Sequence, residues 1–470
     1  MAIWPLYLII LRKVLILKKY FGTDGIRRIA NTDLTPELAY KVAKAGAYVL
    51  AKHASGTPTI LIGRDTRLSG NLIESAMVAG FLSYGANVKI LGVIPTPAVA
   101  YLTKKLGADA GVVISASHNS FEFNGIKFFS NKGMKIPDSI EEEIEEIMDS
   151  DKLNNLNAKD NKIGISENKE EMISDYEDFI VQIFEKSIKQ KLQNRFKVVI
   201  DTANGATYKI SEKIFKRLGI EFKIINNNPN GININKDCGS THLEMLKEYV
   251  ISNKYNLGIA YDGDGDRCLA VDENGNEING DIMLAILSKY LKGENSLNKD
   301  TIVATVMSNL GLDIYCQNNN LNLEKTNVGD RYVLEEMLNN GYNLGGEQSG
   351  HIIFLDYNPT GDGILTSLML IRSMIKYNKK ASELSSIIDI YPQVLVNAKV
   401  DLDKKYLYKE DSEIKNLIHE VEEGLKNEGR VLIRPSGTEP LVRVMIEGKD
   451  IDKITHYAND IAQVIEKKSN

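Results

Sequence analysis

Three aspartates spaced two residues apart are the feature of this sequence with the clearest chemical meaning. Asp262, Asp264 and Asp266 alternate with Gly263 and Gly265, which leave the backbone free to curl around a small centre. Carboxylate oxygens suit hard divalent cations such as Mg²⁺ or Ca²⁺, whereas Zn²⁺ usually recruits cysteine or histidine. The run therefore predicts a site for a hard divalent cation.

The aspartate run directly follows an apolar segment, residues 257–261, which predicts a buried strand. Open α/β sheets bind ligands beyond the carboxyl ends of their strands, and this loop would lie there. A calcium-binding EF-hand and a solvated acidic turn are the alternatives. The spacing from Asp262 to Glu273 fits an EF-hand, but Arg267 stands where that loop needs glycine. The flanks also predict strands, with a hairpin turn at 272–275.

Three further polar loops follow predicted strands. They are residues 115–119 (Ser-Ala-Ser-His-Asn), 345–351 (Gly-Gly-Glu-Gln-Ser-Gly-His) and 434–440 (Arg-Pro-Ser-Gly-Thr-Glu-Pro). The last offers an arginine, two hydroxyls and a glycine N–H, the donors that a phosphate needs. The first offers a serine nucleophile beside His118, with Lys127 nearby. For Ser115 and Ser117 taken alone, an ordinary turn is the favoured interpretation.

The elements that must carry these loops predict an α/β protein. A helix opened by Thr35 and Pro36 precedes strands at 59–62, 88–91 and 110–114. Helical stretches separate these strands, which is typical of a mainly parallel sheet. An acidic amphipathic helix at 139–149 is expected to turn its glutamates toward solvent, and the Lys-, Asn- and Asp-rich residues 150–168 are expected to form a linker or surface loop.

The rest of the chain predicts two more units of this plan and a different last one. Strands are expected at 196–201, 221–226, 257–261 and 302–306, and an apolar helix at 361–377. From about Tyr391 the order is strand, helix, strand, strand, helix. A chain of 470 residues is too long for one core. We expect an N-terminal extension at 1–18 and domains at 19–168, 169–272, 273–389 and 390–470.

Composition narrows the function classes. An apolar content of 43% is ordinary for a soluble protein, and a net charge of −6 argues against a nucleic-acid surface. Three well-separated cysteines suit a reducing compartment. Residues 1–17 are apolar, but Arg12 and Lys13 leave too short a run to span a bilayer. We expect an over-extended gene start and no stable membrane insertion; a membrane-associated segment is the alternative.

Taken together, the motifs resemble the phosphoglucosamine mutases of the α-D-phosphohexomutase superfamily from about Lys19 to the C-terminus. The matching stretches, in the family's order, are residues 21–27, 63–70, 117–119, 124–127, 238–242, 262–267, 328–331, 347–351, 359–363 and 434–440. The resemblance implies an α/β fold of four domains around a central cleft. Three would be related α/β domains with mixed sheets, and the C-terminal domain would be α+β.

The resemblance also implies residue roles. Ser117 would carry a phosphoryl group, and its phosphate would hold one Mg²⁺ together with Asp262, Asp264 and Asp266. The other residues at the reacting centre would be Arg27, His118, Lys127, Arg267 and His351, with Lys127 or His351 moving the proton. Glu347 and Ser349 would bind sugar hydroxyls, and the non-reacting phosphate would be bound by Arg434, Ser436, Gly437 and Thr438.

The implied activity interconverts glucosamine 6-phosphate and glucosamine 1-phosphate. The enzyme would carry a phosphoserine, and glucosamine 1,6-bisphosphate would be both primer and intermediate. The reaction would take place in the cytoplasm and would feed the synthesis of UDP-N-acetylglucosamine and of the cell wall. The resemblance also suggests a homodimer. A phosphoglucomutase or phosphomannomutase, a metal-dependent phosphatase and a non-catalytic sugar-phosphate-binding relative remain alternatives.

Two positions depart from the family pattern. Ser120 stands where proline is usual, and Arg28 stands where glycine is usual. Ser120 is expected to loosen a rigid turn, and Arg28 excludes easy use of a positive φ. Neither change removes a group that takes part in chemistry.

Overall fold

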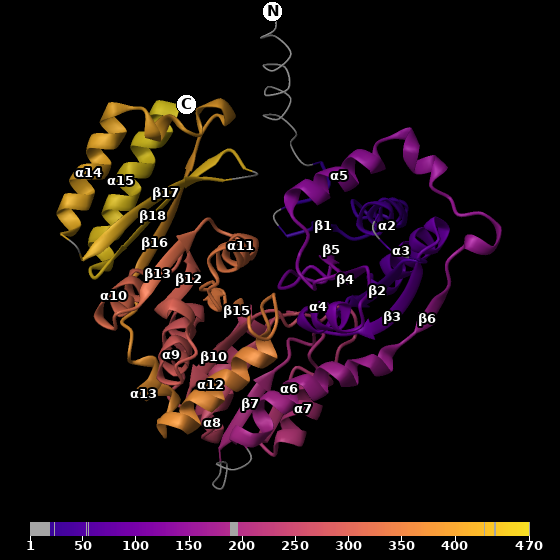
Figure 1. The fold of residues 1–470 in the computed structure, drawn as a ribbon. Coiled ribbons are helices and arrows are strands. Elements are labelled where there is room, and N and C mark those ends of the chain that lie inside the picture. The colour runs from indigo at the N-terminus through magenta and orange to yellow at the C-terminus, as the bar shows by residue number, and fades with distance from the viewer. Residues whose placement is uncertain are drawn as a thin grey trace, which may run out of the picture. The chain divides into compact units, whose positions relative to one another are not determined.

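The computed structural model describes residues 19–22, 24–52, 54, 56–188, 196–426, 428–436 and 439–469. The expected extension at 1–18 lies outside these residues. The chain divides into two compact units, coloured along the sequence in Figure 1. The first runs to Val306 and includes Glu324–Ser385, and the second combines Met307–Leu323 with Ser386–Asn470.

The first sheet has six strands in the order β1-β5-β4-β2-β3-β6. Its parallel part consists of β4 (Ala110–Ile114), β2 (Thr59–Arg64), β3 (Asn87–Val93) and β6 (Ser166–Asn168). Two antiparallel strands complete it, β5 (Phe123–Ser130) and β1 (Ile26–Ile29). The sheet is mixed because the chain returns from β4 to β5 through the short loop at 115–122, without a crossover helix.

Helices of this region are α2 (Pro36–Leu50), α3 (Gly70–Tyr84), α4 (Thr96–Lys105) and α5 (Asp138–Met148). The helix α2 begins at Pro36, as predicted. The Thr35 side chain caps it by accepting a hydrogen bond from the Leu38 N–H. The expected linker is only partly irregular, since β6 pairs with β3 at the sheet edge. Arg28 lies inside β1, a position that needs no positive φ.

The α5 helix departs from the expectation that its glutamates face solvent. Glu141 and Glu145 are 2% and 7% exposed. Glu145 accepts the backbone N–H groups of Lys19, Tyr20 and Phe21 at 2.7–2.8 Å. The Arg331 guanidinium donates to Glu141 at 2.9 Å. The expectation was wrong for these two residues because their partners lie far away along the chain.

The second sheet positions the aspartate loop. Its order is β11-β10-β9-β7-β8. The parallel strands are β7 (Lys197–Asp201), β8 (Glu221–Ile225) and β9 (Leu257–Tyr261), and the antiparallel ones are β10 (Cys268–Asp272) and β11 (Glu277–Ile278). The accompanying helices are α6 (Ile173–Ile188), α7 (Ile210–Leu218) and α8 (Glu244–Asn253). The predicted strands and the hairpin after Cys268 are confirmed.

The third sheet has the order β13-β12-β14-β15. Its strands are β12 (Thr301–Thr305), β13 (Asn322–Thr326), β14 (Leu344–Gly346) and β15 (Ile352–Phe354). The helices are α9 (Gly280–Gly293), α10 (Leu310–Asn318), α11 (Asp330–Asn340), α12 (Gly363–Tyr377) and α13 (Ala381–Ser385). The expected apolar helix is α12, whose N-cap is Asp362.

The second unit ends in a small α+β domain with the predicted element order. Its antiparallel sheet is β16-β18-β17, formed by β16 (Gln393–Lys399), β17 (Gly429–Pro435) and β18 (Leu441–Gly448). Two helices, α14 (Ser412–Leu425) and α15 (Ile451–Ser469), pack against it around a core that includes Ile414, Val444 and Ile461. Figure 1 shows this sheet and its helices in the yellow end of the colour range.

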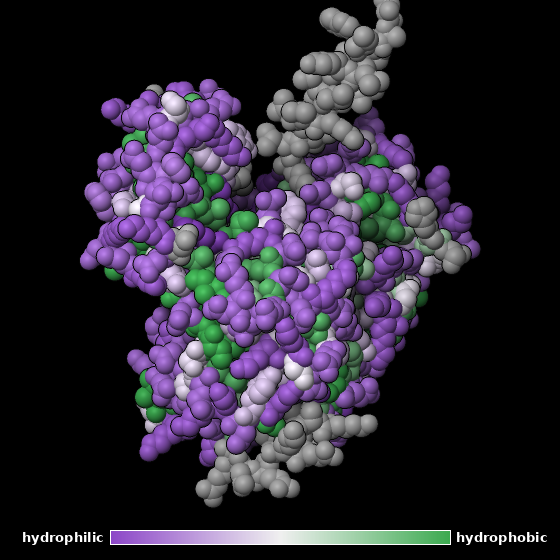
Figure 2. Space-filling view, turned by 60° about the vertical axis from the view of Figure 1, so that its left-hand side comes forward, coloured by the Kyte–Doolittle hydropathy of each residue, from purple (hydrophilic) through white to green (hydrophobic). Residues whose placement is uncertain are grey.

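Short 3₁₀ helices occupy connections throughout the described chain. They are η1 (Asp151–Asn155), η2 (Asp160–Lys162), η3 (Glu170–Met172), η4 (Gly239–Thr241), η5 (Asn298–Asp300), η6 (Leu402–Lys404) and η7 (Leu407–Lys409). Within the described residues, no helix is long and apolar enough to cross a membrane. The face in Figure 2 is mainly hydrophilic, with hydrophobic residues in small separate patches.

Candidate active site

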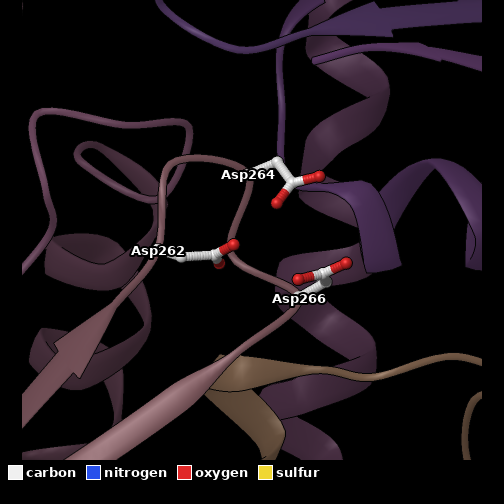
Figure 3. Close-up of side chains that lie close together, drawn as sticks. All are labelled: Asp262, Asp264 and Asp266. Atoms are coloured by element: carbon white, nitrogen blue, oxygen red, sulfur yellow. The ribbon is translucent and has the colours of Figure 1, made fainter. Parts of the chain in front are cut away.

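The aspartate loop connects β9 to β10 and brings its three carboxylates together. Asp262, Asp264 and Asp266 are buried, and one oxygen from each lies within 4.8 Å of the others. Figure 3 shows the three carboxylates close together at this loop. Strands flank this loop on both sides, so it is not an EF-hand, whose loop lies between helices. Its burial also excludes the solvated turn.

The electrostatics of this loop fit a divalent cation. Oδ1 of Asp264 and Oδ1 of Asp266 are buried and have no hydrogen-bond partner within the described part of the chain. Burial, together with the charges of Asp266 and Asp264, raises the pKa of Asp262 well above its usual range. A hard cation bound by the three carboxylates would use the unpartnered oxygens and offset the crowded negative charge.

The serine loop meets the aspartate loop at Ser117. Its Oγ donates a hydrogen bond to Asp262 Oδ2 at 2.5 Å, and the residue is 1% exposed. The loop begins directly after β4, and Ser117 adopts a left-handed conformation with φ of 52°. Two of the four loops singled out in the sequence therefore form one centre.

Lys127 extends from β5 into this centre. Its Nζ lies 3.0 Å from Asp24 Oδ2, 3.1 Å from Asp264 Oδ2 and 3.6 Å from Asp266 Oδ2. Burial alone would lower the pKa of Lys127, but these carboxylates together raise it well above its usual value. Lys127 is therefore a charged donor among the aspartates, and its expected part in proton transfer stays a prediction.

His118 and two arginines surround Ser117. His118 Nδ1 lies 3.4 Å from Ser117 Oγ and 3.0 Å from an Arg267 guanidinium nitrogen. Burial, Arg267 and Arg27 lower the pKa of His118 to about 4, so its imidazole is neutral near pH 7. Arg27 donates to Asn119 Oδ1 at 2.9 Å and to Asp24 at 2.9 Å. The structure thus brings Arg27, His118 and Arg267 to the serine loop, and their roles in the reaction stay predictions.

His351 brings the third loop to the same centre. Its Nδ1 lies 3.6 Å from Asp266 Oδ2, and its Nε2 lies 3.3 Å from Asp330 Oδ2. Burial alone would lower the pKa of His351, but Asp330 and Asp266 raise it. The Gly361 N–H donates to Nε2 at 2.9 Å, so the neutral ring carries its proton on Nδ1, facing Asp266.

Glu347 and Ser349 offer polar groups on this loop. Glu347 Oε1 accepts the Gly329 N–H at 3.2 Å, and burial raises the pKa of Glu347. Ser349 Oγ is buried without a hydrogen-bond partner among the described residues. A buried hydroxyl that lacks a partner is suited to a ligand hydroxyl, and the sugar-binding role expected of Glu347 and Ser349 stays a prediction.

The sequence analysis missed a charged network that joins these loops. Lys135 Nζ lies 2.5 Å from Asp24 Oδ1 and also contacts Asp330 Oδ2. Asp24 in turn binds Lys127 and Arg27, and Asp330 contacts His351. Asp24 and Asp330 lie within two of the stretches that match the family, 21–27 and 328–331. Their place in these stretches was the one sequence signal that could have identified them as site residues.

The fourth loop belongs to the second unit. Arg434 lies in β17, where burial and Arg443 lower its pKa. Ser436 is 6% exposed; its carbonyl accepts Lys405 Nζ at 2.9 Å, and its Oγ accepts the Glu439 N–H at 3.2 Å. Gly437 and Thr438 lie outside the described residues. The phosphate-binding role of this loop stays a prediction.

Four family models match successive parts of the chain. They describe the phosphoglucomutase/phosphomannomutase α/β/α domain I at residues 18–155, domain II at 174–275, domain III at 279–391 and the C-terminal domain at 395–464. The chain belongs to the phosphoglucomutase/phosphomannomutase family. The fold of three mixed-sheet α/β domains and a C-terminal α+β domain is confirmed.

Similar curated proteins locate the chain within this family. The phosphoglucosamine mutase of Clostridium beijerinckii is 54% identical, over 96% of this chain and 100% of that protein. The phosphoglucosamine mutase of Ruminiclostridium cellulolyticum is 54% identical, over 95% of this chain and 99% of that protein. The resemblance to phosphoglucosamine mutases is therefore confirmed.

Solved structures share the fold at low identity. A phosphoglucomutase/phosphomannomutase family protein from Burkholderia thailandensis has a TM-score of 0.78 and 21% identity, covering 97% of this chain and 99% of that one. The Aspergillus fumigatus N-acetylphosphoglucosamine mutase, solved in complex with GlcNAc-6P and magnesium, has a TM-score of 0.71 and 17% identity, covering 96% of each chain.

Proposed function

We propose that the protein is a phosphoglucosamine mutase that interconverts glucosamine 6-phosphate and glucosamine 1-phosphate. The observation that carries the proposal is the 2.5 Å contact between Ser117 Oγ and Asp262, inside a buried aspartate triad with Lys127 beside it. The choice of an amino sugar rests on the 54% identity to proteins of that name over nearly their whole length.

In this reaction Ser117 carries the phosphoryl group. The free hydroxyl of the sugar phosphate attacks phosphorus, the bond from phosphorus to Ser117 Oγ breaks, and glucosamine 1,6-bisphosphate forms. The bisphosphate then returns its other phosphoryl group to Ser117, and the isomeric monophosphate leaves. Such transfers depend mainly on positioning and on stabilising charge.

Cationic side chains supply part of that charge stabilisation. Arg27 and Arg267 flank the serine loop, and Lys127 lies among the aspartates. His118 is neutral in this state, so its Nδ1 accepts from Arg267 and positions that guanidinium beside Ser117. Lys127 and His351 remain the groups proposed to exchange the proton of the attacking hydroxyl.

Asp262, Asp264 and Asp266 are the residues proposed to hold Mg²⁺. When bound, the ion would neutralise phosphate charge and lower the barrier to transfer. The carboxylates themselves orient the centre, since Asp262 accepts from Ser117 and Asp264 accepts from both Lys127 and Thr96. Glu347 and Ser349 are proposed to bind sugar hydroxyls. Arg434, Ser436, Gly437 and Thr438 are proposed to bind the phosphate that does not react.

A serine substitution with a matched control tests this proposal. Ser117→Ala should abolish turnover of glucosamine 6-phosphate in the presence of Mg²⁺ and the 1,6-bisphosphate. Ser120→Ala removes an exposed hydroxyl of the same loop and should keep the activity. Intact-mass measurement should find a phosphoryl group on the wild type and on Ser120→Ala only. Full activity of Ser117→Ala would overturn the proposal, and steady release of inorganic phosphate by the wild type would indicate a phosphatase.

The proposed domains are those expected at 19–168, 169–272, 273–389 and 390–470. A cytoplasmic location and a homodimer are also proposed, on the ground of the family resemblance. Sedimentation of the purified full chain tests the dimer: a single monomeric species across micromolar concentrations would contradict it.

A further inference from the structure

Ser117 occupies a backbone conformation that its own residue type does not favour. Its φ of 52° lies in the left-handed region, which serine rarely adopts. Such conformations persist only where the surroundings hold them, and they concentrate at functional sites. The groups that hold this peptide therefore decide where Ser117 Oγ points.

Arg67 holds the serine loop from one side. The residue is buried, and its guanidinium uses all five of its N–H groups. Nε donates to Asp65 Oδ2 at 2.8 Å, and the remaining four N–H groups donate to loop carbonyls. These carbonyls belong to Ser117 at 3.0 Å, Asn119 at 2.8 Å, Phe123 at 3.0 Å, and Ser120.

Asp65 extends this support to the backbone N–H of Ser117. Ser115 Oγ donates to Asp65 Oδ2 at 2.5 Å and accepts the Ser117 N–H at 2.9 Å. Asp65 also accepts the Arg67 backbone N–H at 2.9 Å. Both polar groups of the Ser117 backbone are therefore fixed within the first domain.

Asn235 holds the same loop from the second domain. It lies between β8 and η4 and is 6% exposed. Its Nδ2 donates to the carbonyl of Ser117 at 2.8 Å and to that of Asn119 at 2.9 Å. These two oxygens are also bound by one Arg67 nitrogen, so each receives two donors. Rotating the amide would turn Oδ1 toward two carbonyl oxygens, which excludes the opposite assignment.

Gly263 brings the aspartate loop against this arrangement. A Cβ at Gly263 would lie 2.6 Å from the Ser117 carbonyl oxygen and 2.9 Å from Asn235 Nδ2. Only glycine permits this approach, and the approach places Asp262 within hydrogen-bond distance of Ser117. The donors that shape the serine loop thus also set its distance from the aspartates.

We propose that Arg67 and Asn235 form a positioning clamp that holds the Ser117 peptide in its left-handed conformation and so aims Oγ at the aspartate loop. The proposal rests on Ser117 being the phosphoryl carrier. Neither residue is placed on the substrate or on the reacting atoms; both act through the carbonyls of Ser117 and Asn119. Because residues 115–123 contain no proline to stiffen the backbone, these hydrogen bonds supply the rigidity of the loop.

Asn235→Ala is the first test, because it removes two hydrogen bonds and leaves no charge unpaired. A displacement of the serine of about 1 Å is expected to lower kcat by roughly tenfold to a hundredfold. KM for glucosamine 6-phosphate should change little, because the substrate contacts are intact. Single-turnover transfer from isolated phospho-Ser117 enzyme should slow by the same factor as kcat.

Asn343→Ala provides the matched control. Asn343 is also a buried asparagine, 3% exposed, and its side chain bonds the Ser296 carbonyl and Asp356 in the third domain. Asn343 Oδ1 also accepts the Asn298 N–H, so Asn343→Ala should lower Tm at least as much as Asn235→Ala does but leave kcat per folded enzyme unchanged. An Asn235→Ala enzyme with wild-type kcat, or with a loss equal to that of Asn343→Ala, would overturn the clamp.

Arg67→Lys tests the part of the clamp that Arg67 forms. Lysine keeps the charge beside Asp65 but presents its three donors from one point, so it cannot bind four separate carbonyls. Its kcat should fall further than that of Asn235→Ala, and a kcat close to the wild type would contradict the proposal. If Arg67→Lys does not fold, Asn235→Ala decides alone. A wild type that stays inactive although Ser117 is fully phosphorylated would instead refute the mutase function on which the proposal rests.

Discussion

Phosphorylation of Ser117 should change the charge of His118. Beside an unmodified Ser117, burial and the charges of Arg267 and Arg27 lower the pKa of His118 to about 4, against an ordinary 6.5. His118 Nδ1 lies 3.4 Å from Ser117 Oγ, so a phosphate bonded to that oxygen would lie beside the ring. A dianionic phosphate favours the protonated imidazole and should raise the pKa.

The size of this effect follows from the distance. Even one of the phosphate's two negative charges, at about 4 Å and an effective dielectric constant of about 20, contributes roughly 4 kcal/mol. Because each pH unit corresponds to about 1.36 kcal/mol, this interaction moves the pKa upward by about three. Phosphorylation therefore shifts His118 from a neutral acceptor of the Arg267 hydrogen bond toward a protonated donor near neutral pH.

NMR titration of the His118 ring in the two forms measures this shift. In the unphosphorylated protein, the ring should stay neutral from pH 8 to below pH 5. The lowered pKa means that His118 contributes stability above pH 6.5, and that this contribution is lost as the pH falls from 6.5 toward about 4. Phospho-Ser117 protein without Mg²⁺ should titrate at a distinctly higher pH. An unphosphorylated His118 that titrates near 6.5, or equal values in both forms, would refute the reasoning.

Three other results are expected. Glu145→Ala leaves the N–H groups of residues 19–21 without their acceptor and should lower the free energy of unfolding by about 3 kcal/mol. Glu146 is exposed, so Glu146→Ala should change the free energy of unfolding by less than about 0.5 kcal/mol. Equal effects of the two substitutions in denaturant titrations would contradict the burial of Glu145. The three cysteines are buried, and burial raises the pKa of Cys238 to about 12, so none of them should react with thiol reagents in the native protein. All three should react after unfolding, and rapid labelling of the native protein would contradict this. Chelation should abolish turnover and Mg²⁺ should restore it, while Asp264→Asn should raise the Mg²⁺ concentration needed for half-maximal activity in a titration; metal-independent activity would oppose the proposed site.

Much of the fold was predictable because its signals are local. The apolar run at 257–261, the alternating aspartates and the turn at 272–275 together specified β9, a buried loop of three close carboxylates and the hairpin, and the structure confirms all three. The strand at 110–114 likewise ends where the serine loop begins. These predictions depend on residues that are neighbours in sequence, so a single chain carries the information.

What could not be predicted depends on partners far along the chain. Periodicity identified the apolar stripe of α5, but it does not report that residues 19–21 and Arg331 cover Glu145 and Glu141. Asn235 resembles an ordinary loop asparagine until the second domain brings it within 2.8 Å of the Ser117 carbonyl. The raised pKa of Lys127 likewise arises from Asp24, Asp264 and Asp266, which only the folded chain places around its Nζ.

The most direct test of the central claim is a comparison of initial rates on glucosamine 6-phosphate and on glucose 1-phosphate. Each assay would contain Mg²⁺, a trace of the matching 1,6-bisphosphate and enzyme with known phosphorylation at Ser117. A strong preference for the amino sugar is predicted. A preference for glucose 1-phosphate would contradict the assigned substrate, and no turnover of either sugar by fully phosphorylated enzyme would contradict the mutase function itself.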